Sequence, residues 1–371
     1  MEPQVSLSAP DVSQAEIDAV VAVLRTPVLS LGPKMVEFEQ AFCRRLGVRH
    51  AVAVNSGTSA LHLVWRAMDV GAGHEVITTP FSFIASSNRI MFEGARPVFV
   101  DVEPDTWQID PRRIEAAITP KTRAILPVDV FGSIPDMDAI NAIARRHKLR
   151  VLEDSCEALG SSYRRRPAGT LADAGVFGFY PNKQITTGEG GMVVTDDDDV
   201  ARLVRSLRNQ GRDPDAGWLA HARLGFNFRL HELSCALGVV QMSRLDEIAA
   251  RRTQVAQWYV ERLHDERRVS FQRVPPEVAI NWFVMVVRLS DEYTQQQRDA
   301  ILEKLRAAGI QCSNYFTPIH LQPFYQSDLG CRPGDFPITE ALSARTVALP
   351  FHNHLGERDV ERVVDTLRRL L

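Results

Sequence analysis

The chain has 371 residues, of which 45% are hydrophobic, and a formal net charge of −3. This charge gives no electrostatic reason for binding nucleic acid or an anionic membrane, and no apolar run is long enough to span a bilayer. The five cysteines lack the spacing of metal ligands, so we expect reduced thiols and no metal site. The N-terminus lacks the features of a signal peptide, so we expect a cytoplasmic protein.

Short apolar runs alternate with helical patterns along the chain. They predict strands at residues 51–54, 75–78, 97–100, 123–128, 149–152 and 282–287. Amphipathic patterns predict helices at residues 136–147, 232–263, 294–308 and from 357 onward. Such alternation is typical of an α/β fold with a largely parallel sheet covered by helices. Because the pattern over 232–263 leads out of the first sheet, we expect a large domain over 1–250 and a small one over 251–371.

A glycine-containing turn at residues 55–59 joins the first predicted strand to a helix that starts near Ala60. A helix N-terminus presents unpaired N–H groups and the positive end of the helix dipole, and Gly57 lets an anion approach the backbone. Such joints are frequent in α/β proteins, so this one indicates a phosphate site only together with other features. Two phenylalanines at residues 79–83 are able to stack on a cofactor, although core packing is the commoner explanation.

A carboxylate stands at the end of another predicted strand, where Glu153 and Asp154 follow residues 149–152. Ligands of open α/β sheets lie at the carboxyl ends of strands, which places Asp154 beside a cofactor. A carboxylate there can hold a pyridine nitrogen protonated and make pyridoxal phosphate (PLP) an electron sink. Taken alone, Asp154 is more simply explained as a helix cap.

One lysine lies between an aromatic strand and a glycine-rich turn, in residues 175–191. The chain has five lysines against 38 arginines, and the other four lie in turns or at helix ends and surfaces. In an apolar, glycine-flanked pocket Lys183 loses hydration, which favours the neutral amine needed for a Schiff base. The alternative is a lysine whose stem lies along a buried strand end while its amine reaches water. Lys183 and Asp154 together favour the cofactor site.

Three other polar clusters are explained without a function. The four aspartates at residues 196–199 favour the N-terminus of a helix from Val200. The arginines at residues 164–166 lie between Tyr163 and Pro167 and predict an exposed hairpin tip. His352 and His354 have no partner at ligand spacing, so we expect no metal there.

Taken together, these motifs resemble those of the DegT/DnrJ/EryC1/StrS family of sugar aminotransferases. The resemblance covers nearly the whole chain in the order of the family, through residues 30–33, 55–61, 153–154, 183, 188–191, 225–229, 318–320 and 349–350. It implies the PLP-dependent transferase fold of type I, like that of aspartate aminotransferase. In that fold a mostly parallel seven-stranded sheet forms the large domain, and a small α/β domain follows at the C-terminus.

The resemblance also implies roles for individual residues. Lys183 is expected as the Schiff-base lysine and Asp154 as the partner of the pyridine nitrogen. The residues expected to bind the cofactor are Gly57, Thr58, Ser59, Phe83, Asp154, Glu157, Lys183 and Asn227. Among these, Gly57 and Thr58 would bind the phosphate, Phe83 would stack on the ring, and Asn227 would reach the phosphate site of a neighbouring subunit. Arg229 and His320 are expected near the sugar-nucleotide substrate.

Two positions depart from the common pattern of the family. Many relatives have serine at the position of Gly178, where the hydroxyl binds the phosphate. Many also have glutamine at the position of Glu157, where the amide donates to the ring oxygen of the cofactor. An ionised glutamate cannot donate that hydrogen bond. The branch that makes GDP-perosamine is similar to this chain in having glutamate there.

The activity implied is ping-pong transamination by a homodimer with shared active sites. L-glutamate would supply the amino group, and a keto group of a nucleotide-linked deoxy sugar would accept it. The turn at residues 186–191 resembles that of the branch that aminates at C4, whereas relatives that aminate at C3 tend to have Gly-Asp-Gly-Gly there. The alternatives are a C3-keto sugar or a keto-cyclitol as substrate, and a catalytically silent regulator. A related dehydratase branch has histidine in place of the lysine, which Lys183 argues against.

Overall fold

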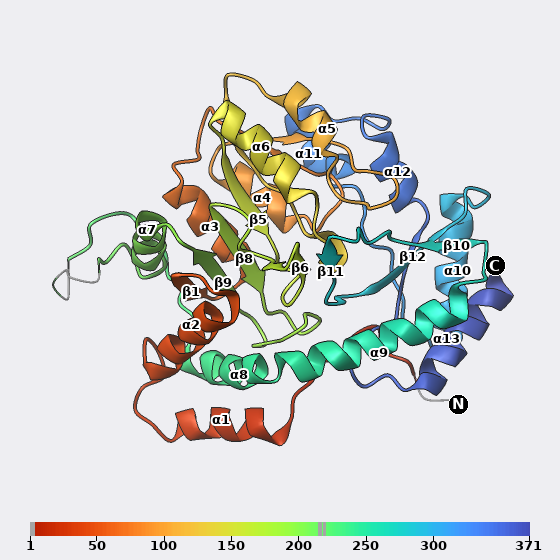
Figure 1. Ribbon diagram of the computed structural model, residues 1–371, viewed down its shortest axis with the longest axis horizontal. Helices are drawn as coiled ribbons and strands as arrows, with labels where there is room; N and C mark the ends of the chain where they lie inside the picture. Colours follow the sequence, from red (N-terminus) through yellow and green to blue (C-terminus); the bar gives the residue numbers. More distant parts are fainter. Residues whose placement is uncertain (1–3, 214–216, 218–219) are drawn as a thin grey trace.

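A mixed seven-stranded sheet dominates the part of the chain that the computed structural model describes, residues 4–213, 217 and 220–371 (Figure 1). Its order is β1-β9-β8-β5-β4-β2-β3. The strands are β1 (His50–Val54), β2 (Glu75–Thr78), β3 (Arg96–Phe99), β4 (Thr122–Ile125), β5 (Arg150–Asp154), β8 (Ala174–Gly178) and β9 (Gly191–Thr195). Strand β9 runs antiparallel to β8 and β1, and the pairings from β8 to β3 are parallel. The predicted mostly parallel sheet is confirmed.

Helices cover this sheet and connect its strands. They are α1 (Gln14–Leu24), α2 (Pro33–Leu46), α3 (Gly57–Ala67), α4 (Ala85–Phe92), α5 (Pro111–Ile114), α6 (Met137–His147) and α7 (Asp198–Arg208), with 3-10 turns η1 (Glu115–Ala117) and η2 (Val130–Gly132). Asp197 caps α7 by accepting the N–H groups of Asp199 and Val200, as expected for the acidic turn. Arg164 and Arg165 form the predicted hairpin tip between β6 (Ser162–Tyr163) and β7 (Arg166–Pro167). Strand β6 also pairs with β11 (Val278–Ala279).

The predicted helix over residues 232–263 is wrong in one respect, because the structure divides it into α8 (Glu232–Ser243) and α9 (Leu245–Leu263). The two helices follow one another across the lower half of the molecule in Figure 1, with α1 below α8. The break is at Arg244, which has φ −97° and ψ 2°. Its guanidinium forms ion pairs with Asp11 and Glu16 of the N-terminal segment and with Glu247. Periodicity alone continues across this residue and did not reveal the break.

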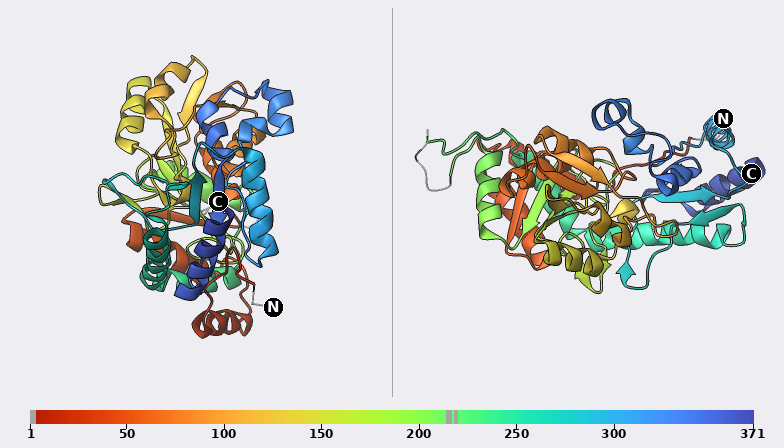
Figure 2. Two further views of the ribbon diagram at one scale, coloured as in Figure 1. Left: turned by 90° about the vertical axis from the view of Figure 1, so that its right-hand side faces the viewer. Right: turned by 90° about the horizontal axis from the view of Figure 1, so that it is seen from above.

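A second, antiparallel sheet of order β10-β12-β13 lies beside the large sheet along the long axis of the molecule (Figures 1 and 2). Its elements and neighbours are β10 (Val269–Phe271), β12 (Met285–Leu289), α10 (Gln295–Ala307), η3 (Ile319–Leu321), α11 (Pro323–Leu329), α12 (Pro337–Ser343), β13 (Thr346–Leu349) and α13 (Glu357–Leu370). The strand predicted at 282–287 is therefore displaced toward the C-terminus. The carbonyls of Trp282 and Phe283 accept hydrogen bonds from Arg252 instead of entering the ladder.

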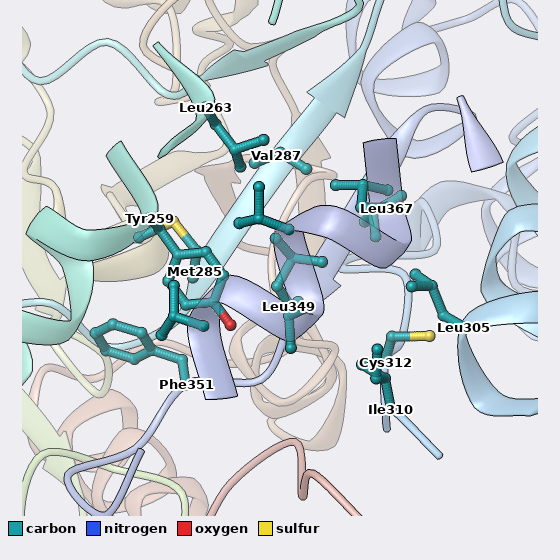
Figure 3. Close-up of a cluster of buried hydrophobic side chains, with 14 of the residues drawn as sticks. Tyr259, Leu263, Met285, Val287, Leu305, Ile310, Cys312, Leu349, Phe351 and Leu367 are labelled. Carbon is teal, nitrogen blue, oxygen red and sulfur yellow. The ribbon is translucent and has the colours of Figure 1, made fainter. Parts of the chain in front are cut away.

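The second sheet has a core of its own (Figure 3). Tyr259 and Leu263 of α9 pack there against Met285, Leu349 and other strand residues. Val5 joins the same core and pairs with Ile310, so the N-terminal segment returns to the C-terminal part of the chain. Helix α9 runs across residue 250. The domain boundary expected at that residue therefore stays a prediction. Among the described residues, no helix is long and apolar enough to cross a membrane.

Candidate active site

A cavity of about 790 Å³ opens at the carboxyl ends of β1, β5 and β8. The turns after these three strands are not adjacent in sequence, and the sheet brings them together. Side chains of the segments before β12 and after α10 line the other wall. The residues that line the cavity and enter the arguments below are Ser56, Gly57, Thr58, Phe83, Ser86, Asp154, Cys156, Glu157, Gly178, Tyr180, Asn182, Lys183, Glu189, Phe283, Tyr315, Ile319 and Gln322. The motifs around Gly57, Asp154 and Lys183 thus meet at this edge.

The N-terminus of α3 forms one end of the cavity. Ser56 caps the helix and accepts the N–H of Ser59, and Gly57 and Thr58 line the cavity. A Cβ on Gly57 would lie 2.8 Å from Cys156 Sγ, and a Cβ on Gly191 would lie 2.6 Å from Gly57 N. Because such contacts are too short, both glycines are needed for the turn to pack this closely. The cradle fits a phosphate group, whereas Ser59 is buried and belongs to the cap.

Asp154 is buried at the end of β5 and presents its carboxylate to the cavity. Ser86 Oγ donates to Asp154 Oδ2 over 2.7 Å, and the Cys156 N–H donates to Oδ1 over 3.2 Å. These two hydrogen bonds, one to each oxygen, fix the orientation of the carboxylate. The residue that follows the strand is part of no helix, so the helix-cap explanation of Asp154 does not hold.

Lys183 lies in the turn after β8, and its side chain is 15% exposed. Its Nζ lies 3.5 Å from Glu157 Oε1 and 4.1 Å from the centre of the Phe283 ring. The Lys183 N–H donates to Tyr180 O and closes the turn. The amine therefore faces the cavity, not the solvent, and the alternative of a lysine that only reaches for water is wrong.

Glu157 is buried on the same wall as Lys183. Burial raises the pKa of its carboxyl, against the opposing attraction of Lys183, and the Phe131 N–H donates to Oε2 over 2.9 Å. A raised pKa favours the protonated carboxyl, which has an O–H to donate.

The two phenylalanines at residues 79–83 have different surroundings. Phe81 is fully buried and packs edge-to-face against Phe131 and Phe316. Phe83 is 60% exposed and lines the cavity, which leaves its ring free to cover a ligand. The core explanation holds for Phe81 and is wrong for Phe83.

Three predicted residues lie outside the cavity of this chain. Asn227 is exposed on an extended segment beside β1, where it pairs with Asn209. Arg229 Nη1 donates to Asn209 Oδ1 over 3.0 Å. His320 is fully buried, its Nε2 is 3.0 Å from Glu340 Oε1, and it does not line the cavity. The structure therefore gives no direct substrate contact to His320 within one subunit.

Sequence reasoning missed several residues of the site. Ser86 holds Asp154, Phe283 lies beside Lys183, and Cys156 forms part of the floor near Gly57. Ser86 and Cys156 carried a signal, since they follow or flank motifs already singled out. Phe283 carried no such signal, because no local sequence pattern connects it with Lys183, which is 100 positions earlier.

The cradle of α3, the carboxylate at the end of β5 and the lysine after β8 fit pyridoxal phosphate. The cradle offers N–H groups to the phosphate, and a carboxylate and an amine lie in the same cavity. The fold and the site therefore define a PLP-dependent transferase of fold type I.

Comparison with known proteins identifies the class further. The model of the DegT/DnrJ/EryC1/StrS aminotransferase family matches residues 10–368. GDP-perosamine synthase from Caulobacter vibrioides is 41% identical over 100% of this chain and 99% of its own length. PseC from Helicobacter pylori, an aminotransferase involved in the biosynthesis of pseudoaminic acid, has a TM-score of 0.93 and 29% identity, with 99% of each chain covered. The Streptococcus pneumoniae protein Spr1654, solved in PLP and PMP forms, has a TM-score of 0.94 and 27% identity over 99% of this chain and 98% of its own.

The chain belongs to the DegT/DnrJ/EryC1/StrS aminotransferase family. Its cofactor is pyridoxal 5′-phosphate, and it is an aminotransferase. The resemblance inferred from the motifs is thus confirmed over the whole chain.

Gly178→Ser is expected to tighten cofactor binding. A Cβ on Gly178 would lie 3.5 Å from Cys156 Sγ and 3.8 Å from Gly57 Cα, which are ordinary contacts. The added hydroxyl would reach the phosphate cradle, and a net hydrogen bond of about 1 kcal/mol lowers Kd about fivefold. Titration of the cofactor-free protein with PLP measures Kd.

Gly178→Ala is the matched control, because it adds the same Cβ without the hydroxyl. We expect its Kd to stay near that of the original protein. Equal Kd values for the serine and alanine variants would show that the hydroxyl finds no phosphate partner.

A buried acid pair supports the strand end that carries Asp154. Asp129 is fully buried, accepts from Ser155 Oγ over 2.7 Å and lies beside Glu153. Glu153 accepts the N–H groups of Gly169 and Leu171. Burial, together with the charge of Glu153, raises the pKa of Asp129 well above its usual range. We therefore expect Asp129 to be the member of this pair that keeps its proton.

Asp129→Asn is expected to remove a pH-dependent loss of stability. The pKa of Asp129 is higher in the folded protein than in the unfolded chain. Its contribution to the free energy of unfolding is therefore fully present below the unfolded pKa and is lost as the pH rises through the folded pKa. Asparagine keeps a donor for Glu153 and an acceptor for Ser155 without a proton to lose. Thermal melts at pH 5 and pH 8 with saturating PLP should show a smaller decline in Tm for the variant. An equal decline in both proteins would show that Asp129 does not hold the proton.

Proposed function

We propose that this protein transfers an amino group from L-glutamate to the C4 keto group of a nucleotide-linked deoxy sugar, in the cytoplasm, during amino-sugar biosynthesis. The observation that carries the proposal is that Lys183, Asp154 and the α3 cradle share one cavity. The 41% identity to a GDP-perosamine synthase over the full chain supports the choice of a sugar-nucleotide substrate. The Thr-Gly-Glu-Gly-Gly turn at residues 187–191 supports C4 over C3.

The residues that would hold the cofactor are already in place. Gly57 and Thr58 would bind the phosphate at the N-terminus of α3, Asp154 would pair with the ring nitrogen, and Phe83 would cover the ring. When bound, PLP supplies an electron sink for the bonds broken at the donor's α-carbon. Ser86 and the Cys156 N–H keep the carboxylate of Asp154 aimed at the cavity throughout.

Lys183 performs the proton transfers. Its amine would be the group that holds the cofactor covalently. The free Nζ would be the base that moves a proton from the donor's α-carbon to the cofactor in the first half and from the cofactor to the carbon that accepts the amino group in the second. Its position within the cavity, 15% exposed, limits access of competing water.

A panel of keto sugar nucleotides tests the substrate. Each is incubated with purified protein, PLP and ¹⁵N-labelled glutamate, and NMR of the product locates the label. We expect ¹⁵N at C4 of a 6-deoxy sugar nucleotide. Label at C3, or transfer only to a free cyclitol, would contradict the proposal.

The proposal includes a homodimer in which Asn227 completes the site of the other subunit. Phe226 and Phe228 turn inward and pack against His62, whereas Asn227 between them is exposed.

A set of exposed apolar side chains also supports a protein interface. It comprises Val12, Ile17, Val21, Leu24, Val28, Leu29, Leu31 and Val36. Ile17, Val21 and Leu24 follow the helical spacing of one stripe on α1, which supports a protein interface there.

Mixed dimers of Lys183→Ala and Asn227→Leu chains are expected to recover activity. Each variant alone is impaired at both sites. In a mixed dimer one site carries both changes and the other is intact, since contacts in a twofold dimer are reciprocal. Random exchange makes about half of the dimers mixed and restores about a quarter of the original sites.

Native mass spectrometry verifies the exchange, and each variant incubated alone is the control. If verified mixed dimers recover no activity, Asn227 either acts within its own subunit or has no part in the active site.

A further inference from the structure

The Lys183 amine has two neighbours that hold it when it is not bonded to the cofactor. One is the Glu157 carboxyl at 3.5 Å, and the other is the face of the Phe283 ring at 4.1 Å. Phe283 is 2% exposed, so water does not compete for the ring face. A desolvated ammonium over an aromatic ring is stabilised more than an exposed one.

Phe283 is held in place by a buried arginine on α9. Arg252 is 3% exposed, and its Nε and Nη2 donate to Trp282 O over 2.7 Å and to Phe283 O over 2.9 Å. Its Nη1 donates to Asn353 Oδ1 over 3.2 Å. Residues 282–283 lie just before β12 and outside its strand ladder, so the hydrogen bonds from Arg252 hold their backbone instead.

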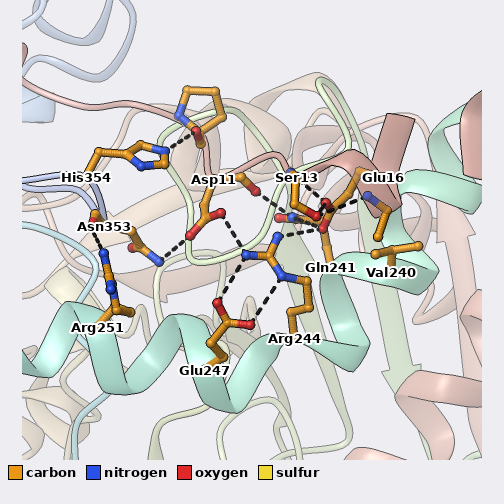
Figure 4. A network of polar contacts seen from close by, with 12 residues as sticks. Asp11, Ser13, Glu16, Val240, Gln241, Arg244, Glu247, Arg251, Asn353 and His354 are labelled. Atoms are coloured by element: carbon orange, nitrogen blue, oxygen red, sulfur yellow. Dashed lines mark hydrogen bonds and ion pairs between the residues drawn. The ribbon is translucent and has the colours of Figure 1, made fainter. Parts of the chain in front are cut away.

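The support continues to the N-terminal segment (Figure 4). Asn353 Nδ2 donates to Asp11 Oδ2 over 2.9 Å, and Asp11 pairs with Arg244. Gln241 donates to Glu16 and accepts the Thr186 N–H, three residues after the lysine. The polar network thus supports both the turn that carries Lys183 and the segment that carries Phe283.

We propose that Phe283 is a positioning residue for the catalytic lysine, whose ring face holds the Lys183 side chain beside Glu157 whenever its amine is free and protonated. This inference rests on the proposed role of Lys183. The ring provides a site for the ammonium without a second carboxylate that would compete for the proton. It also keeps Nζ on the cavity wall.

Trace labelling of lysine amines over a range of pH tests the proposal. The full-length protein is saturated with pyridoxamine phosphate, in which state the Lys183 amine is free. Peptide mapping then gives the pH at which half of Lys183 is labelled, and the small number of lysines makes this peptide easy to identify. Phe283→Leu is expected to shift this midpoint to lower pH by about 0.5 to 1 unit, because the ammonium loses the ring.

Phe283→Tyr keeps the ring face and is expected to leave the midpoint near that of the original protein. Phe42→Leu is the matched control, since Phe42 is equally buried but lies in the aromatic cluster with Phe38 and Phe179. The other ionisable groups of the cavity are unchanged in all variants, so the difference reports the ring. These groups are Asp154, Cys156, Glu157, Tyr180, Glu189 and Tyr315.

An unchanged midpoint in Phe283→Leu, or an equal shift in the tyrosine variant, would overturn the proposal. If the leucine variant does not bind pyridoxamine phosphate, Phe283→Met takes its place, because methionine fills a similar volume without an aromatic face. Failure of the proposed function is seen separately, in the original protein, as covalent cofactor on a lysine other than Lys183.

Discussion

Lys183→Ala is expected to lose covalent cofactor and at least about 10⁴-fold in turnover, because one amine supplies both the attachment point and the base. The variant should still bind the cofactor without a covalent bond, since the α3 cradle and Asp154 are unchanged. Turnover with glutamate and the accepted sugar nucleotide measures the loss, and dialysis followed by absorbance measures retained cofactor.

Lys304→Ala is the control for the loss of a lysine, because Lys304 lies on α10, away from the cavity. Activity of Lys183→Ala within tenfold of the original protein would contradict the assignment of the base.

Asp154→Asn is expected to lower turnover by about 10²- to 10³-fold, because the ring nitrogen loses its charged partner at the moment when negative charge develops. Asparagine has nearly the same shape and still accepts from Ser86 Oγ, so the loss reports charge rather than packing. Cofactor content measured beside turnover separates binding from chemistry.

Ser86→Ala provides the graded comparison. It removes the 2.7 Å hydrogen bond to Asp154 Oδ2 and leaves the charge, so we expect a loss well below that of Asp154→Asn. Equal losses in the two variants would mean that orientation of the carboxylate, not its charge, limits the reaction.

Most strands of the large sheet and the residues at their carboxyl ends could be predicted from the sequence. Asp154 and the α3 cradle follow short apolar runs, and a parallel sheet necessarily brings such ends together. Periodicity did not reveal the break at Arg244, because the apolar pattern continues from α8 into α9 and the cause is an ion-pair network with residues of the N-terminal segment.

The direction of individual side chains could not be predicted in the same way. Phe81 and Phe83 have similar local sequence, and burial in the folded chain decides that one packs in the core and the other lines the cavity. His320 shares the short 3-10 turn η3 with Ile319, but its ring points to Glu340 rather than to the cavity. Phe283 reaches Lys183 from a backbone segment that Arg252 holds, and no local pattern connects these three residues.

Borohydride reduction of the PLP-loaded protein, followed by peptide mass mapping, tests the central claim most directly. Reduction fixes the cofactor on the amine that carries it, and five lysines are candidates. The structure predicts a single pyridoxyl group on Lys183, which lies 3.5 Å from Glu157 in the cavity. A pyridoxyl group on any of the other four lysines, with Lys183 unmodified, would contradict the account.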